Sequence, residues 1–163
     1  MKMERTTRLS FKTESAEGTA RFGEAFGAAI RSGVCISLVG ALGAGKTVLA
    51  GAICRGLGVG EAVLSPTFVL YEEFDGRLPV IHIDLYRLEH ESEIEELGIF
   101  DTIGDNKVIL VEWGDRSELL FGLSDIVVEL SSPSPEPARE TERRLDICCT
   151  AQASDVFGSA EKW

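Results

Sequence analysis

The sequence contains no long apolar run. No stretch approaches the roughly 18 consecutive apolar residues that a membrane-spanning helix requires. The opening segment, MKMERTTRLSFKTESAEG, has no apolar stretch of the kind found in secretory signal peptides. We therefore expect a cytoplasmic protein with no membrane partner.

Cysteine is scarce and has no metal-binding spacing. The four cysteines are Cys35 and Cys54, each inside an apolar segment, and the adjacent pair Cys148 and Cys149. None belongs to a CxxC pair or to a Cys/His pattern of the kind that binds zinc. We interpret all four as reduced thiols of a cytosolic protein.

Basic residues are outnumbered by acidic ones, because the chain has 16 Lys and Arg residues and 27 Asp and Glu residues. The formal net charge is −11, and the isoelectric point is near 4.6. Sequence-independent binding of nucleic acid depends on attraction between basic side chains and phosphates. We therefore expect any nucleic acid to be reached through a partner protein.

Apolar patterns divide the chain into strands and helices. At 163 residues the chain can form one substantial core, so we expect a single domain over residues 1–163. One helix has an apolar face from Phe22 to Ile30, and a second runs past Leu49 and ends at Gly58. Strands are expected over residues 6–13, 34–39, 68–74, 79–86, 107–112, 125–130 and 145–150. A short acidic helix is expected within residues 89–105, and a polar connection over residues 131–144.

The order of these elements predicts an α/β fold. Early strands alternate with helices, whereas later strands form hairpins. Such an order favours a mixed sheet that is mainly parallel at the centre and is flanked by helices.

One glycine-rich segment, GALGAGKT from Gly40 to Thr47, lies between a predicted strand and a predicted helix. It matches the pattern G-x-x-x-x-G-K-[ST] of a phosphate-binding loop, which makes the expected fold P-loop NTPase-like. Glycines let the backbone curl so that N–H groups point at phosphate oxygens beside the positive end of the helix. Lys46 is expected to reach the β- and γ-phosphates of ATP, and the Thr47 hydroxyl to bind Mg²⁺. The alternative is a structural turn in which Lys46 extends to solvent.

Two predicted strands end in acidic residues, Asp84 in VIHIDLYR and Glu112 in VILVEW. A site that hydrolyses ATP needs carboxylates that hold Mg²⁺ or position water, usually at the carboxyl ends of neighbouring strands. We assign both acids to that site, with a charge that faces only a loop as the alternative for each. His82, in the same strand as Asp84, is interpreted as a hydrogen-bonded structural residue and not as a ligand.

The segment SPTF, from Ser65 to Phe68, places hydroxyl residues around a proline. It is either a turn initiated by Ser-Pro or a switch in which Thr67 senses the γ-phosphate. The residues leave both interpretations open.

Four segments in order, GALGAGKT, SPTF, HIDLYRL and VEWGDR, together resemble the bacterial TsaE family. The resemblance is good from Thr19 to Trp113 and weaker to about Cys148. It implies a small P-loop ATPase that acts with the TsaB and TsaD proteins in threonylcarbamoyl transfer to tRNA adenosine, with the tRNA reached through the complex. The chain departs from the usual family residues at Ala41, Val48 and Asp115.

The resemblance also implies a role for each site residue. The phosphates are cradled by Leu42, Gly43, Ala44, Gly45, Lys46 and Thr47. Mg²⁺ is bound by Thr47 and Glu112, and Asp84 and Trp113 are required for hydrolysis together with Lys46. Thr19, in TARFG, lies near the adenine.

Two other functions stay open. A small-molecule kinase would share the phosphate loop, but kinases usually clamp the transferred group with several positive side chains. Only Arg77 and Arg87 are basic between Gly56 and Lys107. A non-catalytic module, in which ATP only orders loops for a partner, would have the same motif.

Overall fold

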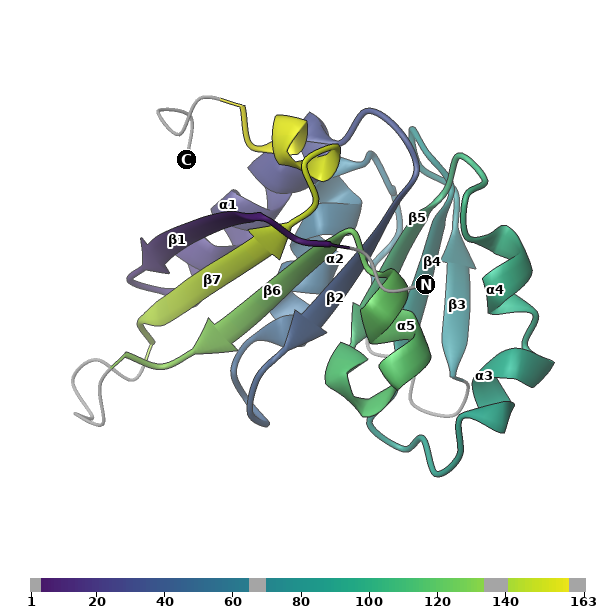
Figure 1. Ribbon diagram of the computed structural model, residues 1–163. Coiled ribbons are helices and arrows are strands. Elements are labelled where there is room, and N and C mark those ends of the chain that lie inside the picture. The colour runs from purple at the N-terminus through teal and green to yellow at the C-terminus, as the bar shows by residue number, and fades with distance from the viewer. Residues whose placement is uncertain (1–3, 65–69, 134–140, 159–163) are drawn as a thin grey trace.

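The computed structural model describes residues 4–64, 70–133 and 141–158, which form one seven-stranded sheet flanked by helices (Figure 1). The strands are β1 (Thr7–Thr13), β2 (Val34–Val39), β3 (Tyr71–Phe74), β4 (Val80–Asp84), β5 (Val108–Glu112), β6 (Ile126–Ser131) and β7 (Arg143–Cys149). The helices are α1 (Ala16–Ala29), α2 (Lys46–Gly56), α3 (Ser92–Glu96), α4 (Ile99–Thr102) and α5 (Glu118–Leu123), with short 3₁₀ turns η1 (Gly114–Arg116) and η3 (Ala153–Val156). In this part of the chain no helix has both the length and the apolar character needed to cross a bilayer.

The sheet has the strand order β1-β7-β6-β2-β5-β4-β3. Its centre is parallel, because β2 pairs in parallel with both β5 and β6, and β4 pairs in parallel with β5. Its edges are antiparallel, since β3 forms a hairpin with β4, and β7 lies between β1 and β6. The prediction of a mixed α/β sheet that is mainly parallel at the centre is confirmed.

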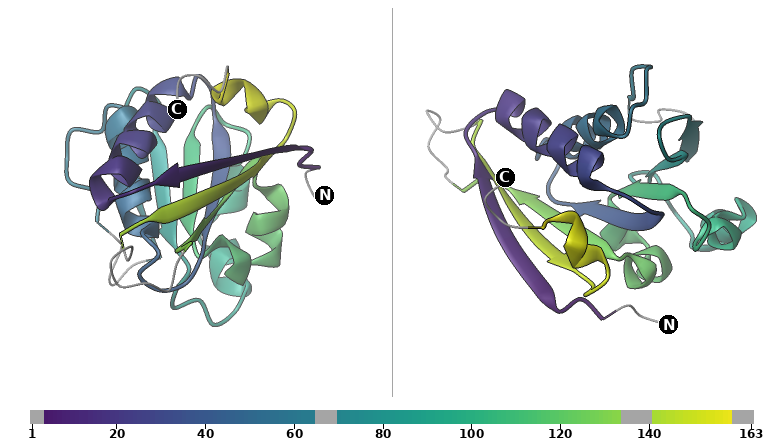
Figure 2. Two further views of the ribbon diagram at one scale, coloured as in Figure 1. Left: turned by 90° about the vertical axis from the view of Figure 1, so that its left-hand side faces the viewer. Right: turned by 90° about the horizontal axis from the view of Figure 1, so that it is seen from above.

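Apolar side chains on both faces of the central strands explain why these segments pair in parallel. Along β5, Val108 and Leu110 join one buried apolar cluster, whereas Ile109 and Val111 join another on the opposite face. The first cluster lies under α1 and α2, and the second under α3, α4 and α5, so helices cover both faces of the sheet (Figures 1 and 2).

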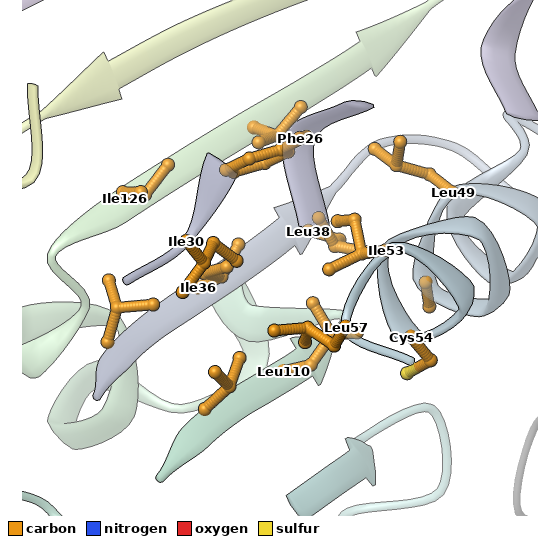
Figure 3. Packing of buried hydrophobic residues seen from close by; sticks show 14 of the residues in the cluster. Phe26, Ile30, Ile36, Leu38, Leu49, Ile53, Cys54, Leu57, Leu110 and Ile126 are labelled. Atoms are coloured by element: carbon orange, nitrogen blue, oxygen red, sulfur yellow. The ribbon is translucent and has the colours of Figure 1, made fainter. Parts of the chain in front are cut away.

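The helices α1 and α2 pack together against β2. Phe26 of α1 and Ile30, which directly follows this helix, meet Ile53 of α2 and Ile36 of β2, and all four side chains are fully buried (Figure 3). The two backbones approach so closely that a Cβ atom on Gly27 would lie 2.1 Å from the carbonyl oxygen of Ile53. This contact anchors α2, and therefore the loop that precedes it, on the sheet.

The strand β7 begins earlier than expected. The sequence predicted a strand from Leu145 and a polar connection up to residue 144, but β7 starts at Arg143. Backbone pairing of Arg143 with Thr13 of β1, and of Arg144 with Ser131 of β6, extends the strand. Two adjacent arginines do not have the alternation of apolar and polar residues by which strands are recognised. The start of β7 therefore depends on pairing with the neighbouring strands and not on local sequence.

Candidate functional site

The carboxyl ends of β2, β4 and β5 meet at one edge of the sheet. Asp84 and Glu112, the last residues of β4 and β5, are register partners in adjacent parallel strands, and β2 leads at the same edge into the glycine loop. A cavity of about 390 Å³ opens there. It is lined by Leu42, Gly43, Gly45, Lys46, Thr47, Val48, Asp84, Tyr86, Glu112 and Trp113.

The loop conformation requires glycine. Gly40, Gly43 and Gly45 have φ angles of 143°, 77° and 101°, which side-chain-bearing residues rarely adopt. Gly45 immediately precedes α2 and has no side chain that could cap the N–H groups of the first helical turn. A helix start without a cap, at the edge of a cavity, is suited to an anionic group.

Lys46 is buried across this loop, with 4% of its surface exposed. Its Nζ donates hydrogen bonds of 2.8 Å to the carbonyl oxygens of both Gly40 and Ala41, and lies 3.7 Å from the ring centroid of Trp113. Burial lowers the pKa of Lys46, and the nearby carboxylates of Glu112, Asp115 and Asp84 oppose that shift. The structure therefore excludes the alternative in which Lys46 extends to solvent.

Thr47, Glu112 and His82 form a chain of hydrogen bonds. The Thr47 hydroxyl donates to Oε2 of Glu112 at 2.7 Å, and Oε1 of the same carboxylate lies 2.8 Å from Nε2 of His82. His82 is fully buried, and its Nδ1 has no hydrogen-bond partner among the described residues. A hydroxyl beside a carboxylate is an oxygen donor pair that suits Mg²⁺, so these residues fit the expected metal.

Asp84 at the end of β4 and Trp113 directly after β5 line the same cavity. An oxygen of Asp84 accepts a hydrogen bond from the N–H of Tyr86 at 2.9 Å, and the rings of Tyr86 and Trp113 lie 5.2 Å apart. Trp113 has a φ angle of 58°, the one positive value at a non-glycine residue in the described chain. Gly114 follows and packs so tightly on Ser37 that a Cβ atom would lie 2.3 Å from its hydroxyl oxygen.

The remaining predicted site residues lie elsewhere or outside the described ranges. Thr19 is buried in α1, where its hydroxyl lies 2.7 Å from that of Thr13, and it does not line the cavity. Ala44 is buried in the glycine loop and does not line the cavity. Thr67, with the rest of the SPTF segment, lies outside the described residues. The proposed adenine and γ-phosphate contacts of Thr19 and Thr67 stay predictions.

Two arginines at the site were missed by the sequence analysis. Arg143 of β7 donates to the carbonyl oxygens of Ala44 and Gly43 in the glycine loop. Arg116 of η1 donates to the carbonyl oxygens of Tyr86 and Leu88, and so joins the loops after β4 and β5. Arg116 belongs to the VEWGDR segment and could have been singled out there, whereas no local pattern marks Arg143.

Comparison with known proteins adds an independent line of evidence. Residues 13–142 match the family model described as threonylcarbamoyl adenosine biosynthesis protein TsaE. The chain is similar to proteins named tRNA threonylcarbamoyladenosine biosynthesis protein TsaE. The Bacillus subtilis protein is 39% identical over 111 residues, which are 68% of this chain and 69% of that protein. The Treponema pallidum protein is 38% identical over 104 residues, 64% of this chain and 77% of that protein.

The fold also has a solved counterpart. The crystal structure of YdiB from Bacillus subtilis superposes with a TM-score of 0.75 and covers 98% of this chain and 96% of that protein. The sequence identity is 24%, so this structural similarity is evidence for the fold alone.

Proposed function

This chain belongs to the TsaE family of threonylcarbamoyl adenosine biosynthesis proteins, and on that premise we propose that it is an Mg²⁺-dependent ATPase that supports tRNA threonylcarbamoyladenosine modification. One observation above all supports this proposal. Lys46, Thr47 and Glu112 meet at the uncapped start of α2, inside one cavity. A buried ammonium, a hydroxyl and a carboxylate at that position match the needs of a magnesium-bound triphosphate.

Phosphate binding in this proposal uses the glycine loop and Lys46. The N–H groups at the start of α2 donate to phosphate oxygens, with the positive end of the helix directed at the same atoms. Lys46 exchanges its hydrogen bonds with the carbonyls of Gly40 and Ala41 for contacts with the β- and γ-phosphates. The exchange is favourable because an ammonium in a partly desolvated site interacts more strongly with a full negative charge than with carbonyl dipoles.

Thr47 and Glu112 would hold Mg²⁺, which when bound neutralises charge on the transferring phosphates. His82 contacts Oε1 of Glu112, whereas Oε2 contacts the hydroxyl of Thr47, so Oε2 is the oxygen that we assign to the metal. An outer residue of this kind fixes the orientation of a metal-binding carboxylate.

Asp84 would position the attacking water. Its carboxylate stands in register with Glu112 at the cavity edge and is only half-buried, so it can hydrogen-bond to a water molecule as well as to the N–H of Tyr86. Trp113 covers Lys46 with its ring and limits solvent access to the reacting groups. Hydrolysis needs both functions, whereas nucleotide binding needs neither.

The partners in this proposal are TsaB and TsaD, and the location is the cytoplasm. A net charge of −11 disfavours direct capture of tRNA, so the RNA would be held by the complex and not by this chain. Thr19 and Thr67 are proposed to contact the adenine and the γ-phosphate, and one domain performs the whole function.

Reconstitution tests the proposal directly. Multiple-turnover threonylcarbamoylation of tRNA is measured with a supplied threonylcarbamoyl donor and with TsaB and TsaD from the same organism. The three mixtures contain this protein, no such protein, or Lys46→Ala. Phosphate release is followed in the same mixtures, and phosphorylated small molecules are sought in a parallel screen. We expect sustained modification and phosphate release only with the wild-type protein.

Equal product in all three mixtures would overturn the proposed function. A phosphorylated metabolite would point instead to a kinase. Modification that needs bound ATP but releases no phosphate from it would point to a nucleotide-gated binding module.

A further inference from the structure

The side chain of Arg143 reaches the glycine loop from a strand that the phosphate-loop motif does not include. Its Nε donates to the carbonyl oxygen of Ala44 at 2.8 Å, and its Nη2 to that of Gly43 at 3.2 Å. A third donor, Nη1, contacts the carbonyl oxygen of the neighbouring Glu142 at 2.8 Å. The planar guanidinium thus holds two successive loop carbonyls through two of its nitrogens, while its third nitrogen stays bonded to the backbone of its own strand.

Holding a carbonyl also directs the N–H of the same peptide unit. In a trans peptide the C=O and N–H bonds point in opposite directions, and the described chain has no cis peptide. Because Arg143 draws the Ala44 carbonyl toward β7, the N–H of Gly45 points away from β7, and Gly45 lines the cavity. The second contact, with Gly43, directs the N–H of Ala44 toward the carbonyl of Ala41, to which it donates at 3.1 Å.

A second cation, Lys46, holds the earlier part of the loop, and the proposed function has it exchange those contacts for phosphate. Lys46 binds the carbonyls of Gly40 and Ala41, and those contacts end once its ammonium turns to a phosphate. Arg143 does not line the cavity, so its two contacts can persist when the cavity is filled. It also offsets the negative ends of two carbonyl dipoles that lie beside an expected anion.

We propose that Arg143 is a positioning residue that holds the glycine loop in its phosphate-binding conformation before nucleotide arrives. This inference rests on the proposed function, since it concerns the same cavity. Arg143 acts through the backbone of Gly43, Ala44 and Gly45 and does not itself touch the nucleotide.

The adjacent residue provides a matched control. Side chains alternate along a strand, so Arg144 lies on the opposite face of β7, where its Nε contacts the carboxylate of Asp146 at 2.8 Å. Both arginines lie in the same strand and have the same charge, and neither is fully buried. Loss of either one removes one positive charge from the protein, but only the loss of Arg143 frees the loop carbonyls.

The test compares Arg143→Gln, Arg143→Lys and Arg144→Gln with the wild type. Dissociation constants for MgATP and MgADP are measured by calorimetry, and thermal unfolding without nucleotide reports folding. We expect Arg143→Gln to weaken both nucleotides by about tenfold, because hydrogen bonds from a charged donor are lost. Arg143→Lys, which keeps the charge but lacks the planar fork of donors, should recover part of that loss. Arg144→Gln should bind like the wild type.

A second measurement separates loop positioning from any other effect and does not depend on nucleotide. In ¹⁵N relaxation experiments on the nucleotide-free proteins, the amides of Gly43, Ala44 and Gly45 should become more mobile in Arg143→Gln and Arg143→Lys than in the wild type and Arg144→Gln. Should Arg143→Gln fail to fold, the lysine variant still decides the matter.

The outcomes distinguish the two proposals. If the wild type binds MgATP and the Arg143 variants bind it equally well, or their loop amides are no more mobile than those of Arg144→Gln, the positioning role is wrong while the proposed function stands. If the wild type binds neither nucleotide, the proposed function fails and this inference fails with it.

Discussion

Thr47 and Glu112 lie 65 positions apart in the sequence, and the hydroxyl of Thr47 donates a 2.7 Å hydrogen bond to Oε2 of Glu112. The contact forms because β5 pairs in parallel with β2, so that the end of β5 lies beside the loop that follows β2. Since His82 holds the second oxygen, the buried carboxylate has partners on both sides. The group that we propose as a metal ligand is therefore oriented before any ligand arrives.

Replacement of Glu112 by Gln should separate magnesium-dependent from magnesium-independent steps. The change preserves shape and removes the negative charge, so we expect ATP hydrolysis to fall by roughly a hundredfold or more. The affinity for ATP without magnesium should not fall, because the amide no longer repels phosphate. The control is Glu129→Gln, on the exposed side of β6, which should leave both quantities unchanged. Turnover at the wild-type rate in Glu112→Gln would remove this residue from the proposed site.

Asp84→Asn should reduce turnover much more than binding. The amide can still accept the hydrogen bond from the N–H of Tyr86, so the loop after β4 keeps its anchor. It cannot orient and polarise water as a carboxylate does, and we expect a loss of about a hundredfold in the rate constant at saturating MgATP. Asp75→Asn, an exposed substitution before the start of β4, is the control. A dissociation constant for MgATP that rises as steeply as the rate falls would contradict the assigned role.

Lys46 should make the stability of the protein depend on pH in the alkaline range. Burial lowers the pKa of Lys46 from its ordinary 10.5, so at pH values just below 10.5 the unfolded chain binds more protons than the folded protein. The contribution of Lys46 to the free energy of unfolding therefore increases as pH rises through that window. Urea unfolding gives the free energy of unfolding of the wild type and of Lys46→Met at each pH in this range. The difference between the two values reports the contribution of Lys46. If this difference stays constant or declines as pH rises, the predicted direction of the pH dependence is wrong.

Gly27→Ala should destabilise the protein strongly, although it adds only one methyl group. The new Cβ atom would lie 2.1 Å from the carbonyl oxygen of Ile53, which belongs to the helix backbone and cannot move alone. We expect a loss of about 3 kcal/mol in the free energy of unfolding, as for an overpacked core. Gly60→Ala, at an exposed position where a Cβ atom meets no other atom within 4 Å, should change stability by less than about 0.5 kcal/mol. Chemical denaturation of both variants measures the two values.

Local sequence patterns were sufficient to predict the central strands and the glycine loop. The segment from Gly40 to Thr47 is correctly predicted as a glycine-rich connection from a strand to a helix, because its glycines and its flanking elements are consecutive in the sequence and act through nearby backbone geometry. The strands β2 and β5 are found for the same reason, since burial on both faces demands a continuous apolar run. The meeting of Asp84 and Glu112 also follows, because parallel neighbours end at the same edge.

Only the tertiary structure decided which distant side chains complete the site. The contact of His82 with Glu112 depends on the register between β4 and β5, and that of Arg143 with Ala44 depends on β7 returning to lie beside β6. A short stretch of sequence does not determine either register. Strand pairing depends on the burial of side chains from many segments that are distant in the sequence. The sequence by itself therefore determined the α/β class and the glycine loop, and tertiary packing determined what orients the carboxylate and what supports the loop.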